Sequence, residues 1–250
     1  MDLSGNDEGG GRVAASMTTP SPSLQPSPDQ TAPSAPETLH VAVVGAGRVG
    51  TAVARSLLDA GYRVSLSASG DPALLALMAE IVTPGAEPKW TGDAVADADL
   101  VILALPLHRL HTVDPALLHG RIVVDAMNYW PPVDGTIPAF AAEPRGSSVV
   151  VQEMFPGAVV VKTFNHTGYH SLEPDRRPAG HPERLGLAVA GDNSQAIALV
   201  SAMVDRIGYD PVPVVSLAAT TFMQPGGPAF GSRLTAAQLE DLAGVPASAA

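Results

Sequence analysis

The sequence predicts an α/β protein with a doubly wound, mostly parallel sheet and a small C-terminal extension. Short runs of apolar, β-branched residues recur along the chain, and segments with helical spacing separate them. These runs are continuous rather than alternating, which is typical of strands covered by helices on both faces. Because strand and helix alternate, right-handed crossovers and parallel pairing are expected.

The first half of the chain contains four predicted strands, in residues 39–47, 62–67, 98–106 and 120–128. The helix expected over Val49–Ala60 ends before Gly61, which suits a C-terminal cap. Another helix is expected over residues 71–81, with Pro72 in its first turn, and a short one over residues 113–119.

The second half begins with a helix over residues 147–155, for which Ser147 is the expected cap. Strands are predicted in residues 157–165 and 184–192. The amphipathic helix over residues 193–208 is expected to start at Asn193 or Ser194 and to end at Gly208. The last strand, "YDPVPVVS", contains two prolines, which place it at an edge of the sheet.

Composition limits the possible partners. The formal net charge is -11 and the pI is about 4.9, which argues against nucleic acid or an anionic membrane as a partner. No run approaches the roughly 18 apolar residues of a membrane span, and the acidic start "MDLSGNDEGG" does not resemble a secretory signal. Without cysteine, disulfides and cysteine-ligated metals are excluded. A cytoplasmic location is expected.

The glycine-rich turn has the spacing G-x-G-x-x-G at Gly45, Gly47 and Gly50, directly after the first predicted strand. In a Rossmann-type dinucleotide site the first glycine makes the tight turn and the second lets the backbone approach the pyrophosphate. The third allows helix and strand to pack closely, and the helix N-terminus attracts the phosphates. Ala46 and Val49 complete this predicted loop. The alternative is a strand-to-helix turn that binds nothing.

Three regions are expected on this basis. Residues 1–37 are rich in Ser, Pro, Gly, Ala and Thr and are predicted to be a disordered tail, because they cannot bury enough apolar surface to offset the entropy of ordering. Residues 38–215 are predicted to form an NAD(P)-binding Rossmann domain. Residues 216–250 are predicted to form the short C-terminal extension.

The choice between NADP and NAD depends on the end of the second strand, where NAD sites usually carry an acid for the ribose 2′-hydroxyl. Here the strand ends in "VSLSASGDP", with Ser67 and Ser69 and no acid before Asp71. We therefore expect NADP, with Arg48 of the glycine loop as the cation for its 2′-phosphate. The alternative for Arg48 is a solvated residue at a helix start.

Five segments, in this order, carry a resemblance to a known family: "VVGAGRVG", "VILALPLH", "VVDAMNYWPPVDG", "VVVKTFNHTGYHSLE" and "LAVAGDNSQA". The chain resembles the NADP-dependent oxidoreductases that use the deazaflavin coenzyme F-420, in particular their shorter bacterial relatives, from Leu39 to about Pro213. The resemblance implies hydride transfer between NADP(H) and coenzyme F-420, a small C-terminal extension and a homodimer. The chain departs from the family's Ser-Arg-Arg phosphate clamp, because it has Ala68, Ser69 and Gly70 there.

Further ligand contacts are expected where other strands end, because ligands of doubly wound sheets bind at the carboxyl ends of the strands. Leu105, Pro106 and Leu107 lie at such a strand end and are expected at the cofactor site. Pro106 and Leu107 would form a wall for the adenosine or the nicotinamide ribose, and His108 could point at the cofactor. Asn128 could bond the nicotinamide carboxamide or the ribose, and Tyr129 and Trp130 offer flat surfaces. Packing under a loop is the alternative for these aromatics. Arg109 and His111 are expected to be loop residues without a ligand role.

The stretch "VVVKTFNHTGYHSLEP" places polar residues directly after a buried strand. Hydride transfer needs two reactive carbons held close together and a polarising group near the accepting ring. Lys162, Asn165 and His166 are the predicted catalytic residues. Tyr169 and His170 are expected to close the loop. A metal site is not expected, because Gly168 separates the two histidines and no acidic motif accompanies them.

The sequence is compatible with three functions. The chain is expected to be an NADP-dependent oxidoreductase whose second ligand is coenzyme F-420 or, failing that, a flavin. One alternative is an NADP-dependent reductase of a small imine or carbonyl compound, although such enzymes usually dimerise through a long helical domain that this chain lacks. The other is a non-catalytic NADP-binding redox sensor.

Overall fold

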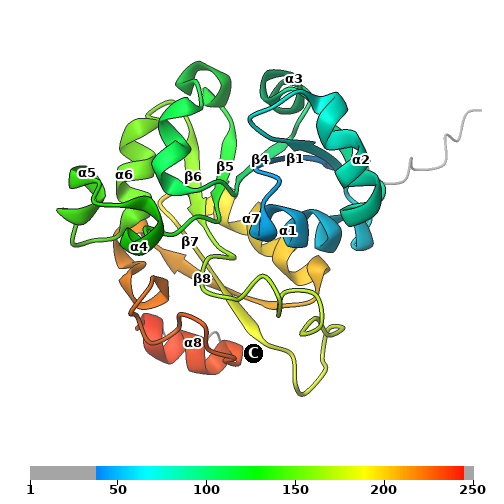
Figure 1. Cartoon of the computed structure of the whole chain (residues 1–250). Coiled ribbons are helices and arrows are strands. Elements are labelled where there is room, and N and C mark those ends of the chain that lie inside the picture. The colour runs from blue at the N-terminus through cyan, green and yellow to red at the C-terminus, as the bar shows by residue number, and fades with distance from the viewer. Residues whose placement is uncertain (1–37, 245–250) are drawn as a thin grey trace, which may run out of the picture. The chain divides into compact units, whose positions relative to one another are not determined.

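The computed structural model of the protein describes residues 38–244, so the tail predicted for residues 1–37 lies outside the described residues. Within 38–244, eight strands form one sheet in the order β3-β2-β1-β4-β5-β6-β7-β8 (Figure 1). The strands are β1 (His40–Val44), β2 (Arg63–Ser67), β3 (Glu87–Pro88), β4 (Leu100–Leu103), β5 (Ile122–Asp125), β6 (Val159–Lys162), β7 (Gly186–Gly191) and β8 (Asp210–Val215).

The predicted fold class is confirmed, with one local correction. All neighbouring strands pair in parallel except β6 and β7, which are antiparallel. The expected alternation of strand and helix fails there, because residues 163–185 connect β6 to β7 without a helix. A parallel neighbour needs a crossover, and this connection provides none. The two-residue β3 was not predicted, and β8 lies at the sheet edge as expected.

The helices predicted over residues 49–60, 71–81, 147–155 and 193–208 are confirmed, whereas the short helices over residues 91–96, 131–134 and 138–141 are not among the predicted segments. The described helices are α1 (Arg48–Asp59), α2 (Pro72–Val82), α3 (Thr91–Ala96), α4 (Pro131–Asp134), α5 (Pro138–Ala141), α6 (Ser147–Met154), α7 (Ser194–Ile207) and α8 (Ala236–Ala243). Asn193 caps α7 with its side chain, and Gly208 ends it in the left-handed conformation. Ser147 does not cap α6 as predicted. It is the first residue of that helix, and Gly146 occupies the cap position without a side-chain bond.

The 3₁₀ segments complete the described elements: η1 (Leu107–Thr112), η2 (Pro115–Leu118), η3 (Leu217–Ala219) and η4 (Thr221–Met223). The segment η2 lies inside the short helix predicted over residues 113–119. None of the helices between residues 38 and 244 has the length and apolar character that a bilayer crossing requires.

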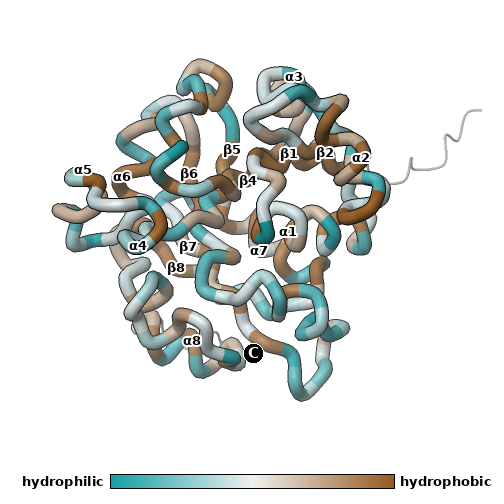
Figure 2. Tube along the Cα trace, viewed as in Figure 1, coloured by the Kyte–Doolittle hydropathy of each residue, from teal (hydrophilic) through white to brown (hydrophobic). Residues whose placement is uncertain are grey.

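Two hydrophobic clusters sandwich the sheet, and successive residues of β1 belong to different clusters. Val41 and Val43 pack with α1 and α7 on one face, whereas Ala42 and Val44 pack with α3, α6 and η1 on the other. Figure 2 shows hydrophobic residues along the central strands. This two-sided burial explains why the strands are continuous apolar runs.

The segment after β8 covers one face of the last two strands. Phe222 and Met223 of η4 and Leu239 of α8 form a third cluster with alternate residues of β7 and β8. In Figure 1, α8 lies next to these strands at the red end of the chain. The described part of the predicted C-terminal extension thus supplies the covering layer for this end of the sheet.

Candidate functional site

The glycine loop joins β1 to α1 in a backbone path that only small residues permit. Gly45 has φ +122°, and a Cβ built on it would lie 2.3 Å from the carbonyl oxygen of Ala104. A Cβ on Gly50 would lie 1.8 Å from the carbonyl oxygen of Gly45. By contrast, a Cβ on Gly47 would have no atom within 4 Å. Gly45 and Gly50 are therefore needed by the fold itself, whereas Gly47 keeps a space open.

Gly47 is also the N-cap of α1, and no side chain caps this helix. The first N–H groups of the helix therefore have no side-chain acceptor, and the helix dipole makes this end attractive to an anion. A phosphate approaching Gly47 would meet bare backbone and these N–H groups. This combination fits the pyrophosphate of a dinucleotide.

A cavity of about 860 Å³, here called the β2 cavity, lies at the ends of β1, β2 and β4. Its walls include the glycine loop, Ser69 after β2, and Arg109 in η1. Trp90, just before α3, and Thr91, the first residue of α3, also line it. Arg109 donates from Nη1 to the Ser69 hydroxyl at 3.4 Å. The predicted cofactor-binding residues that line it are Gly45, Ala46, Gly47, Ser69, Leu105 and Pro106.

A second cavity of about 530 Å³, here called the β5 cavity, lies at the ends of β4 and β5. It shares Gly47, Leu105 and Pro106 with the β2 cavity, so the two meet at the glycine loop. In the doubly wound fold this is where the strand order reverses, between β1 and β4, and where ligands bind. Its other predicted residues are Arg48, Val49 and Asn128, and Trp130, Asp134 and Tyr169 also line it.

Asn128 and Asn165 hold each other at the rim of the β5 cavity. Asn165 donates from Nδ2 to Asn128 Oδ1 at 3.0 Å, and Asn128 donates from Nδ2 to the carbonyl oxygen of Asn165 at 2.8 Å. Asn165 is buried and lines neither cavity, whereas Asn128 reaches the β5 cavity. One hydrogen of Asn128 Nδ2 stays available to a ligand. The structure therefore places Asn165 behind Asn128 as its support.

The turn that carries Asn165 has an unusual backbone. Phe164 has φ +63°, which is uncommon for a residue other than glycine, and its side chain is buried in the core. Thr163 Oγ1, Asn165 Oδ1 and His166 Nδ1 are buried without a hydrogen-bond partner among residues 38–244. Strained backbone and unpaired polar atoms tend to gather at functional sites. Their position directly behind Asn128 fits that tendency.

Lys162 is completely buried and pairs with Asp125 on the neighbouring strand. Its Nζ lies 3.1 Å from Asp125 Oδ2 and donates to the Met127 carbonyl oxygen. Ser148 Oγ donates to the same carboxylate oxygen at 2.6 Å. Burial lowers the pKa of Lys162, and the attraction of Asp125 opposes that shift. The structure brings Lys162 to neither cavity, so in this arrangement its ammonium joins β5 to β6.

His166 is likewise buried away from both cavities. Its Nε2 accepts a hydrogen bond from the N–H of Ala188 at 3.1 Å, which assigns the ring proton to Nδ1. Burial and, to a smaller extent, the nearby charge of Lys162 together lower the pKa of His166 to about 4. The ring is therefore neutral at pH 7 and connects the turn after β6 to β7.

The remaining predicted cofactor residues lie outside the cavities. Gly50 is buried under the glycine loop, and the buried Ser67 hydroxyl accepts a bond from Thr91 Oγ1 at 3.2 Å. His108 bonds Asp134 through its ring and its backbone N–H, at 3.0 and 3.1 Å. Asp134 lines the β5 cavity, whereas His108 does not. Tyr129 stacks on Phe140 and bonds Ile137, as expected for an aromatic packed under a loop.

Tyr169 was predicted only to close a loop, yet it faces the β5 cavity. Arg48 donates from Nη1 to the Tyr169 hydroxyl at 3.2 Å, and the guanidinium lies 5.5 Å from the centre of the ring. These residues are 121 positions apart, so no local pattern could show the contact. Arg109 was also predicted to have no ligand role, yet it lines the β2 cavity. Its contact with Ser69 joins positions that are 40 residues apart, so it too has no local sequence pattern.

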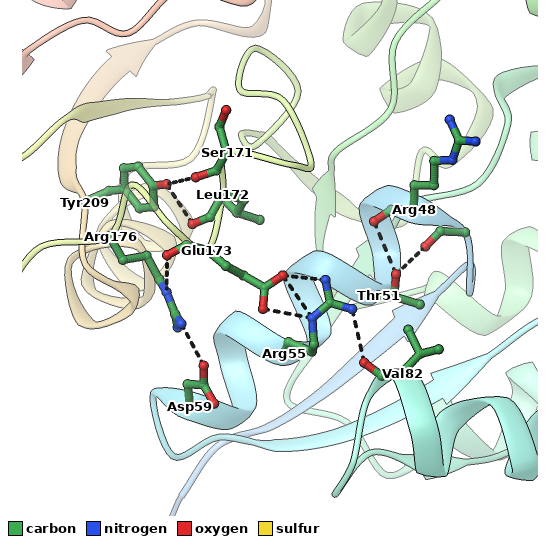
Figure 3. Close-up of polar contacts among 11 residues, drawn as sticks. Arg48, Thr51, Arg55, Asp59, Val82, Ser171, Leu172, Glu173, Arg176 and Tyr209 are labelled. Carbon is green, nitrogen blue, oxygen red and sulfur yellow. Dashed lines mark hydrogen bonds and ion pairs between the residues drawn. The ribbon is translucent and has the colours of Figure 1, made fainter.

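Three residue pairs tie the connection that carries Tyr169 to the rest of the domain (Figure 3). Arg55 of α1 binds both carboxylate oxygens of Glu173 and also donates to the Val82 carbonyl oxygen at the end of α2. Arg176 reaches Asp59 at 2.7 Å, and the Tyr209 hydroxyl donates to the Leu172 carbonyl oxygen at 2.7 Å. We call residues 163–178 the strap.

The described residues offer no clear metal site, since no three His, Asp or Glu side chains of residues 38–244 gather in a group that could hold an ion. The glycine loop, the two adjoining cavities and the sheet topology instead define a dinucleotide-binding protein of the doubly wound α/β class.

Comparison with known proteins extends this class assignment. Residues 40–129 match the family model described as NADP oxidoreductase coenzyme F420-dependent. This confirms the predicted family resemblance over the segment from β1 to the loop after β5. The matched family consists of NADP-dependent oxidoreductases, and the chain is placed in that enzyme class.

Two solved structures are similar to this chain in both sequence and fold. A hypothetical protein from Sinorhizobium meliloti is 28% identical, with a TM-score of 0.65, covering 79% of this chain and 95% of its own. A protein from Arthrobacter sp. FB24, proposed to be an F-420-dependent NADP reductase, is 26% identical, with a TM-score of 0.62 and coverages of 73% and 87%. No curated protein sequence matches the chain significantly.

More distant structures share the fold alone. A variant of the imine reductase from Myxococcus stipitatus, in complex with NAD+, is 16% identical, with a TM-score of 0.50. The match covers 71% of this chain but 55% of the imine reductase.

Proposed function

We propose that the protein transfers a hydride between NADP(H) and a deazaflavin, coenzyme F-420. The observation that carries this proposal is the pair of cavities that meet at Gly47, Leu105 and Pro106. A dinucleotide that lies across the glycine loop has its adenosine half in the β2 cavity and its nicotinamide half at the β5 cavity. The open space at Gly47 and the uncapped start of α1 fit its pyrophosphate.

The β5 cavity has the lining that a second flat ring system requires. Trp130 and Tyr169 offer aromatic surfaces, and Pro106 and Val133 add apolar walls. Asn128 can donate to the nicotinamide carboxamide, while Arg48 can bind an anionic group of the acceptor. NADPH, when bound, supplies the hydride. The role of these residues is to hold and orient the two rings and to keep water from them.

The roles proposed for the predicted catalytic residues differ. Asn165 fixes the amide of Asn128, and we assign it a positioning role. Lys162 and His166 support the same turn from the core. Because neither side chain lines a cavity, we assign both a structural role.

A mixing experiment tests the proposal. When purified protein is mixed with NADPH and oxidised coenzyme F-420, the absorbance of the oxidised deazaflavin should fall. Tyr169→Ala should slow this turnover while NADPH still binds. Parallel reactions with FMN and with cyclic imines or ketones as acceptors identify other reductases. NADPH binding without consumption by any acceptor would instead indicate a non-catalytic sensor.

We also propose that the protein is a homodimer. Within the described residues, α2 exposes three large aliphatic side chains: Leu74 (81%), Leu77 (69%) and Ile81 (75%). Their spacing of three and four residues places them on one helix face. Figure 2 shows hydrophobic residues on α2 at the outside of the domain. Aliphatic surface of this kind is typical of a subunit contact.

A further inference from the structure

Arg109 and Ser69 meet at the end of β2, and we infer that this pair, rather than Arg48, binds the 2′-phosphate of NADP(H). The inference rests on the proposed function and adds the residues that distinguish NADP from NAD. The two side chains are 40 positions apart in sequence, and both line the β2 cavity.

Their place in the fold identifies the group they would bind. In doubly wound dinucleotide sites the residue at the end of the second strand bonds the adenosine ribose at its 2′ oxygen. Here β2 ends at Ser67, and Ser69 is the first hydroxyl after it that lines the cavity. Arg109 Nη1 lies 3.4 Å from that hydroxyl. The guanidinium is therefore beside the position of the 2′ substituent.

The charge of the site favours a phosphate. Arg109 is the one cation among the described residues that line the β2 cavity, and Asp114 is the one carboxylate. Asp114 already accepts a bond from the N–H of Ala116, as the cap of η2. No carboxylate of residues 38–244 forms an ion pair with Arg109. A guanidinium with only a long bond to a hydroxyl can turn to a phosphate and bind it by two parallel bonds.

Arg48 lies on the other side of the glycine loop. It lines the β5 cavity, where it bonds the Tyr169 hydroxyl, and it does not line the β2 cavity. Arg48, expected from the sequence, and Arg109 are therefore alternative ligands for the same phosphate. The two assignments lead to opposite results in one set of binding measurements.

The experiment compares wild-type protein with Arg109→Ala, Arg109→Lys, Arg48→Ala and Arg63→Ala, using calorimetry. The ligands are NADPH and NADH, and adenosine 2′,5′-bisphosphate and 5′-AMP, which isolate the adenosine end. Arg63 is an exposed residue at the opposite end of β2, so its variant controls for the loss of one positive charge. Thermal unfolding of each variant confirms that it is folded.

We expect Arg109→Ala to weaken the binding of NADPH and of the bisphosphate roughly ten- to a hundredfold, which is the usual loss for a hydrogen-bonded charge. The affinities for NADH and 5′-AMP should stay within about twofold of wild type. Arg109→Lys should retain part of the preference. Arg48→Ala should affect NADPH and NADH equally, and Arg63→Ala should affect neither.

Two results would overturn the inference while dinucleotide binding stands: equal loss of NADPH and NADH in Arg109→Ala, or a selective loss of NADPH in Arg48→Ala. Wild-type protein that binds NADH as tightly as NADPH would also overturn it. Failure of the proposed function has a different signature, namely normal NADPH binding without transfer to coenzyme F-420, and the binding contrast between the arginine variants would then still hold.

Discussion

Each glycine of the loop at Gly45, Gly47 and Gly50 has a different neighbourhood, although a sequence motif treats them alike. A side chain at Gly50 would collide with backbone, whereas a side chain at Gly47 would project into open space. One glycine therefore serves folding and another serves binding. A glycine-to-alanine substitution at each position can therefore test the folding role and the binding role separately.

Gly47→Ala should leave the free energy of unfolding within about 1 kcal/mol of wild type, since alanine is only a poorer cap for α1. It should nevertheless weaken the binding of NADPH by roughly tenfold or more, because the methyl group would occupy the pyrophosphate position. Gly50→Ala should cost about 3 kcal/mol or more, because backbone must move. Urea unfolding and NADPH titration measure the two effects. A Gly47→Ala protein that binds NADPH normally would place the pyrophosphate elsewhere.

His166 predicts a pH dependence of stability. Its folded pKa is about 4 and its usual value is 6.5, so the unfolded chain takes up more protons between these limits. The contribution of the neutral ring is therefore complete above pH 6.5 and is lost as the pH falls toward 4. From pH 7 to pH 5 we expect the free energy of unfolding to fall by about 2 kcal/mol from this residue.

Urea unfolding at the two pH values tests this dependence. The matched variant His166→Gln retains an acceptor for the Ala188 N–H and should lose most of the slope. The same variant should remain folded at neutral pH. An unchanged slope would show that other groups cause the pH dependence.

Among the secondary-structure elements, β5 and β6 are joined by the buried pair of Asp125 and Lys162, which are register partners. Lys162→Met should lower the free energy of unfolding by roughly 3–5 kcal/mol, since it leaves the Asp125 carboxylate buried without its cation. Lys89→Met is the matched control, because Lys89 pairs with the exposed side chains of Glu87 and Asp97, and its loss should cost about 1 kcal/mol or less.

This comparison also tests the catalytic role predicted for Lys162. If the lysine only joins the strands, the Lys162→Met protein that remains folded should keep its turnover number in the hydride-transfer assay. A turnover number that falls by orders of magnitude in stable protein would restore the catalytic assignment.

The strap is held to α1 mainly by Arg55 and Glu173 (Figure 3). A double-mutant cycle with Arg55→Ala and Glu173→Ala should give a coupling energy of about 1 kcal/mol, because the pair is bidentate but partly exposed. Both single variants should raise the KM for the acceptor more than the Kd for NADPH, since the strap carries Tyr169 to the β5 cavity. Equal effects on both ligands would mean that the strap does not shape the acceptor site.

For the molecule as a whole, the exposed face of α2 predicts self-association. Light scattering should give the mass of a dimer for wild-type protein, and Leu77→Glu should shift it toward monomer, because a charge cannot be buried in an apolar contact. Glu80→Lys, another exposed position of α2, is the control for a change of charge on this helix and should remain dimeric. A monomeric wild type would refute the proposal.

The amino-acid sequence alone determined the features that depend on neighbouring residues. Runs of β-branched residues, caps such as Asn193 and Gly208, and the glycine spacing after β1 act over a few positions, so they predicted the strands, the main helices and the dinucleotide loop. The family resemblance came from the same local segments.

Tertiary packing decided the rest, because it depends on contacts between distant positions. It made β7 antiparallel to β6, where the chain has no crossover helix. It also placed Lys162 in the core, although its local sequence at the end of a strand predicts a position in the functional site. It also brought Arg109 to Ser69 and Tyr169 to Arg48. Such pairs have no local signature, since the free energy that joins them comes from burial of the whole sheet.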